Sequence, residues 1–76
     1  MTTVIDVKER HNGERVIRRY TVGKAGGVRH PKYYAGCTTK GRNQWVRDIN
    51  RAQVFEHEDA DIAEACAVTV RKRDTE

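Results

Sequence analysis

The residues that could perform covalent chemistry in this 76-residue chain are few and widely spaced. The chain has no serine, and its only thiol and imidazole groups belong to Cys37, Cys66, His11, His30 and His57. A nucleophilic side chain needs a neighbouring base or cation to activate it, and neither cysteine has one beside it in sequence. The sequence therefore predicts no catalytic residue and a protein that is not an enzyme.

Metal and cofactor sites are equally poorly supported. A zinc site built from Cys37, Cys66 and two histidines is arithmetically possible, but no pair has the short ligand spacing of a zinc finger or knuckle. Two cysteines are too few for a disulfide framework, and we interpret them as small buried apolar residues. The glycine-rich segment 23–31 has neither nucleotide-binding spacing, so it is interpreted as a flexible connection and no cofactor is predicted.

Basic residues are the remaining candidates for function. Residues 1–55 contain twelve Lys or Arg against four Asp or Glu, whereas residues 56–67 contain five acids and no base. A basic surface can meet phosphates or an acidic protein, although Lys and Arg on exposed strands also simply blunt sheet edges. The predicted partner-binding residues are Arg15, Arg18, Arg19, Lys24, Arg29, Lys32, Tyr34, Arg42 and Arg47.

Tyr34 is included in that set as an aromatic ring that could stack on a base. Because consecutive strand residues point to opposite faces, one of Tyr33 and Tyr34 is expected in the core and the other is available for stacking. Tyr20 and Trp45 are expected to be core anchors. The alternative contact surface is an acidic helix that mimics phosphate, formed by Glu56, Glu58, Asp59, Asp61 and Glu64.

The elements that would position these residues begin with a β-hairpin. Residues 3–9 and 14–22 are rich in β-branched side chains and flank Asn12-Gly13, the preferred pair for a two-residue type I′ turn. That turn places Ile5 opposite Tyr20 and Asp6 opposite Arg19. It also places Ile5, Val7 and Val16 on the core face, with Ile17 and Arg19 on the open face.

A second hairpin and a helix follow. We expect strands over residues 32–37 and 44–47, a short strand or extended lead-in over 53–55, a helix over 58–67 and a strand over 68–71. The predicted fold class is α+β: an antiparallel sheet of four to six short strands against one C-terminal helix, in the order ββββ(β)αβ. Residues 1–76 form a single domain, with 72–76 as a frayed tail.

The size and hydropathy of the chain bound its location and partners. Since so short a chain buries only about 60% of its unfolded surface, a homodimer is left open. No long apolar run exists and the N-terminus lacks a secretion signal, so we expect a cytoplasmic protein without a membrane partner.

One stretch of the chain resembles small phage and prophage accessory proteins. The residues that carry the likeness are Tyr33-Tyr34-Ala35-Gly36, then the run from Trp45 to Phe55, then Glu58-Asp59-Ala60. The resemblance covers residues 33–65 and involves mainly packing residues. It implies that Ala52, Phe55 and Ala60 seat the helix above Trp45, and it carries no active-site residue.

Accessory proteins of this kind often act stoichiometrically, and anti-CRISPR proteins are the best-known group. The resemblance therefore implies a protein inhibitor of a host defence or nucleic-acid-processing complex as the first hypothesis. Its partner would be a host protein or a protein–nucleic-acid complex, in the host cytoplasm if the chain is phage-encoded. Direct binding of DNA or RNA by the basic sheet is the second hypothesis, and a structural or assembly subunit is the third.

Overall fold

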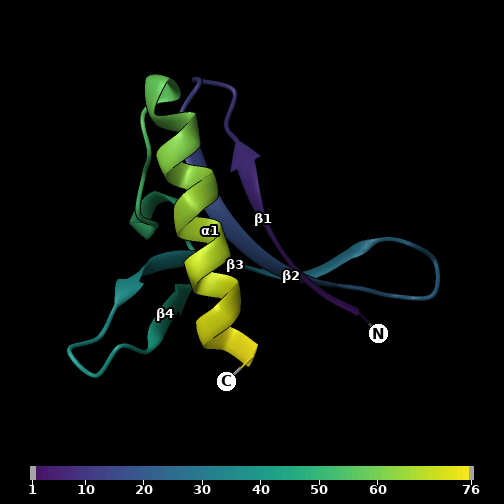
Figure 1. The fold of residues 1–76 in the computed structure, drawn as a ribbon. Coiled ribbons are helices and arrows are strands. Elements are labelled where there is room, and N and C mark those ends of the chain that lie inside the picture. The colour runs from purple at the N-terminus through teal and green to yellow at the C-terminus, as the bar shows by residue number, and fades with distance from the viewer. Residues whose placement is uncertain (1, 76) are drawn as a thin grey trace.

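The computed structural model describes residues 2–75 and consists of a four-stranded antiparallel sheet with one helix across it (Figure 1). The strands are β1 (Thr2–Glu9), β2 (Arg15–Val22), β3 (Val28–Cys37) and β4 (Asn43–Val46), in the spatial order β1-β2-β3-β4. Two 3₁₀ turns, η1 (Ile49–Arg51) and η2 (His57–Asp59), lead into the helix α1 (Ala60–Thr75). The predicted α+β class, with an N-terminal hairpin and one C-terminal helix, is confirmed.

The register of the first hairpin differs from the prediction by one residue. Gly13 N donates to Arg10 O at 2.9 Å and Arg10 N donates to Glu14 O at 2.7 Å, so the loop has three residues. Gly13 accommodates this loop with a φ of +89°, a conformation that glycine adopts at little cost. As a result Asp6 lies opposite Arg18, and the predicted pairing of Asp6 with Arg19 is wrong.

Because side chains alternate between the two faces of a strand, this one-residue shift places each β2 side chain on the face opposite to the predicted one. Ile5 now lies opposite Arg19, and Val7 opposite Ile17. Ile17 therefore faces the helix. Val16, which was predicted for the core face, is buried but does not belong to the core cluster that contains Ile17. Arg19, predicted for the open face, lies on the helix side.

The hydrophobic core is small and lies between α1 and the sheet. Its buried members are Ile17, Tyr34, Phe55, Ala63, Ala67 and Val70, with Ile5, Val7, Trp45 and Cys66 packed against them. The helix contributes mainly alanine, whose short side chain lets the helix axis approach the strands closely. Phe55 and Trp45 pack with the buried helix residues, as predicted, whereas Ala52 and Ala60 are only partly buried and lie outside this cluster.

The C-terminal strand predicted over residues 68–71 is wrong, because α1 continues to Thr75. Ala63, Ala67 and Val70 recur at helical spacing on the buried face, and Val70 is completely buried. Packing of this face outweighs the strand preference of the Val-Thr-Val sequence. The expected tail over 72–76 is helical as far as Thr75, and Glu76 lies outside the described residues.

The extended lead-in predicted at residues 53–55 forms no full strand but bonds to both β2 and β3. Arg15 and Phe55 exchange two backbone hydrogen bonds of 2.8 Å, and Gln53 N donates to Tyr34 O at 2.8 Å. These bonds occupy the space where β2 and β3 diverge, and they seat Phe55 in the core.

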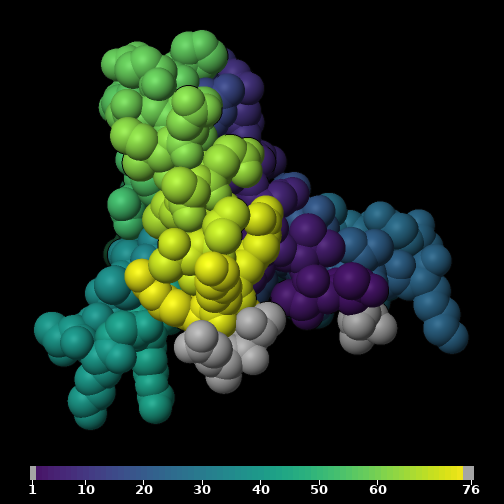
Figure 2. Space-filling view, viewed as in Figure 1, coloured from purple at the N-terminus to yellow at the C-terminus, as the bar shows by residue number. Residues whose placement is uncertain are grey.

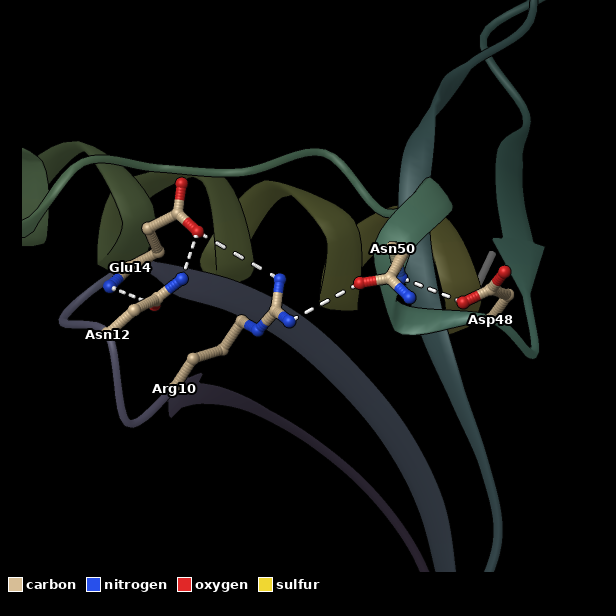
Figure 3. Close-up of polar contacts among 5 residues, drawn as sticks. All are labelled: Arg10, Asn12, Glu14, Asp48 and Asn50. Atoms are coloured by element: carbon tan, nitrogen blue, oxygen red, sulfur yellow. Dashed lines mark hydrogen bonds and ion pairs between the residues drawn. The ribbon is translucent and has the colours of Figure 1, made fainter.

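A polar network ties the first hairpin to η1 (Figure 3). The Arg10 guanidinium lies 3.9 Å from the Glu14 carboxylate and donates to Asn50 Oδ1 at 3.4 Å. Asp48 accepts from the backbone N–H of Asn50 at 2.9 Å and so caps the turn. Arg10 thus fixes the turn of the hairpin against the segment that leads to the helix.

Candidate nucleic-acid interface

The three arginines of β2 are occupied by partners inside the molecule. Arg15 lies 3.5 Å from the Glu9 carboxylate and donates to the backbone carbonyl of His57 at 2.9 Å. The second contact fixes the start of the helical region to the sheet. Arg15, predicted to bind a partner, therefore serves first as a structural brace.

Arg18 is held more tightly, on the sheet face away from α1. Its guanidinium donates to both Asp6 carboxylate oxygens, at 3.2 and 3.0 Å, and lies 4.3 Å from the centroid of the Tyr20 ring. Tyr20 in turn donates its hydroxyl hydrogen to Asp6 at 3.3 Å. The hydrogen bond to Asp6 raises the pKa of the Arg18 guanidinium. These contacts join Arg18, Tyr20 and Asp6 in one cluster.

Arg19 points to the opposite face and spans from β2 to the end of the helix. It lies 3.2 Å from the Asp74 carboxylate and 4.5 Å from the centroid of the Trp45 ring. Fifty-five residues separate Arg19 from Asp74 in sequence, so only the fold brings them together. Arg19 thereby shields one face of the Trp45 ring.

Tyr34, the aromatic member of the predicted set, is a core residue. Its side chain is only 4% exposed and packs edge-on against Trp45, with 5.9 Å between the ring centroids. Its hydroxyl accepts from Arg73 at 3.2 Å, and Arg73 also donates to Asn43 Oδ1 at 3.2 Å. A buried ring cannot stack on a partner, so Tyr34 is removed from the candidate interface.

The other predicted cations remain open. From Arg15 to Arg47 the chain contains nine Lys or Arg and no Asp or Glu, so β3 and both of its connecting loops supply no acid. Within residues 2–75, six of these cations form no ion pair. We call them the open cations: Lys24, Arg29, Lys32, Lys40, Arg42 and Arg47.

Five of the open cations lie on the two hairpin ends and on β3, which joins them, and Arg47 directly follows β4. The β2–β3 loop and the β3–β4 loop project from the body on either side of the C-terminal part of α1 (Figure 2). Lys24 lies in the first loop, and Lys40 and Arg42 lie in the second. Lys40 was missed by the sequence analysis, although a cation beside Gly41 in a predicted hairpin turn is a signal that could have included it.

Shallow hollows lie between these projections. Lys32 and Arg47 line a groove of about 400 Å³ with His30 and Pro31. Two further hollows, of about 300 and 470 Å³, lie on either side of the Arg19–Asp74 pair. The β2–β3 side contributes His30 and Lys32 to the first, and the β3–β4 turn contributes Arg42 to the second. These three hollows on the basic surface are therefore open to solvent.

Acidic side chains gather where the helix begins. Glu56, Glu58, Asp61 and Glu64 are exposed and Asp59 is partly exposed. Carboxylates at this end and Lys72 and Arg73 in the last turn both complement the helix dipole. The molecule is therefore polar along the helix, with its acidic start far from the basic hairpin ends (Figure 1).

The thiol and imidazole groups have different surroundings. Burial raises the pKa of the Cys66 thiol, which disfavours the nucleophilic thiolate, and Cys37 is exposed. His57 Nδ1 lies 3.4 Å from Arg15. In the part of the chain that the structure describes, no group of three or more His, Cys, Asp or Glu residues is arranged to hold a metal ion.

Comparisons of the chain with models of protein families, with curated proteins and with solved structures find no match. Over residues 2–75, no helix has the length and apolar character needed to span a membrane.

Proposed function

We propose that this protein is a non-catalytic binding protein that contacts the phosphate backbone of a nucleic acid through its open cations. The observation that carries this proposal is the acid-free stretch from Arg15 to Arg47, in which five exposed cations and the partly exposed Lys32 form no ion pair among residues 2–75. The electrostatic attraction between such cations and phosphates is long-ranged and does not depend on nucleotide sequence.

Salt dependence tests this proposal. Each neutralised phosphate lowers the binding constant by a factor of about 3.5 between 50 and 200 mM salt, so three or more contacts predict a loss of at least about 40-fold. Fluorescence anisotropy of a labelled 20-base-pair DNA measures it. A binding constant that is unmeasurable at 50 mM salt, with the protein folded, contradicts the proposal.

A second candidate function is a stoichiometric inhibitor of a host defence or nucleic-acid-processing complex, anti-CRISPR-like in type. The acidic start of the helix favours it, because four exposed carboxylates there can meet a basic protein groove that normally holds nucleic acid. An affinity pull-down from a bacterial lysate, with and without nuclease, separates the two. A host protein that remains bound after nuclease treatment supports the inhibitor, whereas loss of all partners supports nucleic-acid binding.

Both candidates place the protein in the cytoplasm, that of the host cell if a phage encodes it. A homodimer is compatible with either, since the outer edge of β1 has no neighbouring strand among residues 2–75. Size-exclusion chromatography with light scattering measures the stoichiometry, and a mass of 8.7 kDa at working concentration indicates a monomer.

A further inference from the structure

We propose that the nucleic acid is duplex DNA and that the end of the β2–β3 hairpin enters its major groove, while the remaining open cations contact flanking phosphates. This inference rests on the proposed function and narrows it to one class of ligand. It follows from which aromatic rings are covered, from the shape of the hairpin end and from the irregularity at its base.

The aromatic side chains give single strands no stacking platform. Tyr34 and Phe55 are buried, at 4% and 8% exposure. Trp45 lies beneath Arg19, and Tyr20 lies beneath Arg18. Proteins that bind single strands gain much of their affinity by stacking bases on exposed rings beside a basic groove.

Tyr33 is the remaining ring, and it is on the wrong side of the sheet. It lies opposite Arg18, so it shares the sheet face away from α1. Its neighbour Lys32 lies opposite Arg19 and points to the helix side. One ring on one face and the basic groove on the other cannot act on the same strand.

The β2–β3 hairpin end has the shape of a groove-binding ribbon. Its last strand pair is Val22 with Val28, and the connecting residues 23–27 contain three glycines, Lys24 and Ala25. A Cβ placed on Gly26 or Gly27 meets no atom within 4 Å, so the tip is slim and open. The major groove of B-DNA, about 12 Å wide, admits a two-stranded ribbon.

Arg29 lies along this ribbon, close to its tip. Its Nε is 3.1 Å from the position that a Cβ on Gly23 would occupy, so the side chain crosses the first loop residue. Lys24 and Arg29 thus place two cations where a base edge or a groove-lining phosphate would lie. Arginine and lysine are the side chains that most often read guanine in the major groove.

An irregularity separates the hairpin end from the rest of the sheet. The β2–β3 register shifts by one residue between the pairs Arg19–Lys32 and Thr21–Arg29. His30 lies within this shift and has a φ of +54°, a conformation rare outside glycine. Such bulges bend and re-aim strands, and here the bend lies where the ribbon leaves the body (Figure 1).

The same geometry favours DNA over RNA. The major groove of an A-form RNA duplex is deep and narrow and does not admit a protein ribbon. We therefore expect the protein to bind a 20-base-pair DNA duplex about tenfold more tightly than either the matching RNA duplex or one of its DNA strands.

Fluorescence anisotropy with these three probes tests the ligand class. Equal affinity for the three overturns this inference and leaves phosphate binding standing. Absence of binding to all three overturns both. Since a duplex has a higher charge density than a single strand, the RNA duplex is the probe that separates groove entry from charge alone.

A matched pair of variants tests the hairpin end itself. Replacing residues 23–27 by Asn-Gly removes the tip and the charge of Lys24 while allowing a tight turn between Val22 and Val28. Lys24→Ala removes the charge alone and should weaken duplex binding only about threefold, as expected for one phosphate contact. The shortened hairpin should lose about thirtyfold and bind DNA and RNA duplexes equally. Equal losses in the two variants contradict groove entry.

Gly27→Leu keeps the test valid if the shortened hairpin fails to fold. A Cβ at this position meets no atom within 4 Å and Gly27 is exposed, so the variant should unfold like the parent. It broadens the tip and should weaken duplex DNA binding about tenfold with little change for RNA. Unchanged binding to DNA contradicts a tip that lies in the groove.

Discussion

The arginines of β2 and the open cations carry the same charge but have different surroundings. Arg15, Arg18 and Arg19 each contact an acid on another element, at 3.0 to 3.5 Å. The open cations have no acidic partner among residues 2–75, and all except the partly exposed Lys32 are exposed. The charge of a residue alone is therefore a poor guide to a binding surface, because a cation that is already paired with an acid is less available to a ligand.

The largest effect that this comparison predicts is on DNA affinity. The triple change Lys24→Glu, Arg29→Glu and Arg42→Glu replaces three attractions to phosphate by three repulsions. It should weaken duplex binding at least about 100-fold and leave the unfolding free energy within about 0.5 kcal/mol. Anisotropy and urea unfolding measure the two quantities.

The matched control for this triple change is Glu56→Gln, Glu58→Gln and Glu64→Gln at the start of the helix. It also changes three exposed charged residues, but at the acidic end of the molecule, and duplex binding should stay the same or strengthen slightly. If this control abolishes partner binding and the triple reversal does not, the acidic end is the contact surface.

Arg18→Ala should show the converse pattern. It removes a two-pronged bond to Asp6 and the stack on Tyr20, so the unfolding free energy should fall by about 1 to 2 kcal/mol. Duplex affinity should change less than about twofold, since the side chain is already engaged. A large loss of affinity without a loss of stability shows that Arg18 belongs to the interface.

Tyr34→Phe examines the buried member of the predicted set. Only the hydroxyl is lost, and with it the bond from Arg73. We expect a loss of about 1 kcal/mol in unfolding free energy and no change in duplex affinity. An effect on affinity alone contradicts the assignment of Tyr34 to the core.

Asp74→Asn should give the smallest effect and the opposite sign. It removes the one carboxylate that pairs with Arg19 between two basic hollows, which frees that guanidinium for phosphate. Duplex affinity should rise about threefold, as one added phosphate contact allows. Arg19→Ala in the same background is the control, because it should abolish the gain.

The sequence predicted most of the fold and less of the site, for identifiable reasons. The hairpin at Asn12-Gly13 and the helix that buries Ala63 and Ala67 were readable from local pattern. The register was not, because Asn-Gly serves a two-residue or a three-residue loop, and here Gly13 takes the second role. The strand predicted at residues 68–71 failed because tertiary packing of Val70 outweighed local preference.

The sequence showed the basic stretch from Arg15 to Arg47, but it did not show which of its cations are held by other parts of the molecule and which are open. Arg19 is neutralised by Asp74, 55 residues away, and Arg15 is held by the backbone of His57. Such long-range pairs follow from how the helix crosses the sheet. Tyr33 and Tyr34 were known to point to opposite faces, and only the position of the helix determines which ring is buried.

The most direct test is an NMR titration of the ¹⁵N-labelled protein with a 20-base-pair DNA duplex. The account predicts that amide shifts change most in residues 22–32 and 38–43, with small changes in residues 15–19 and 56–64. The largest changes at 56–64, with residues 22–32 unmoved, would contradict it and assign the contact to the acidic end of the molecule.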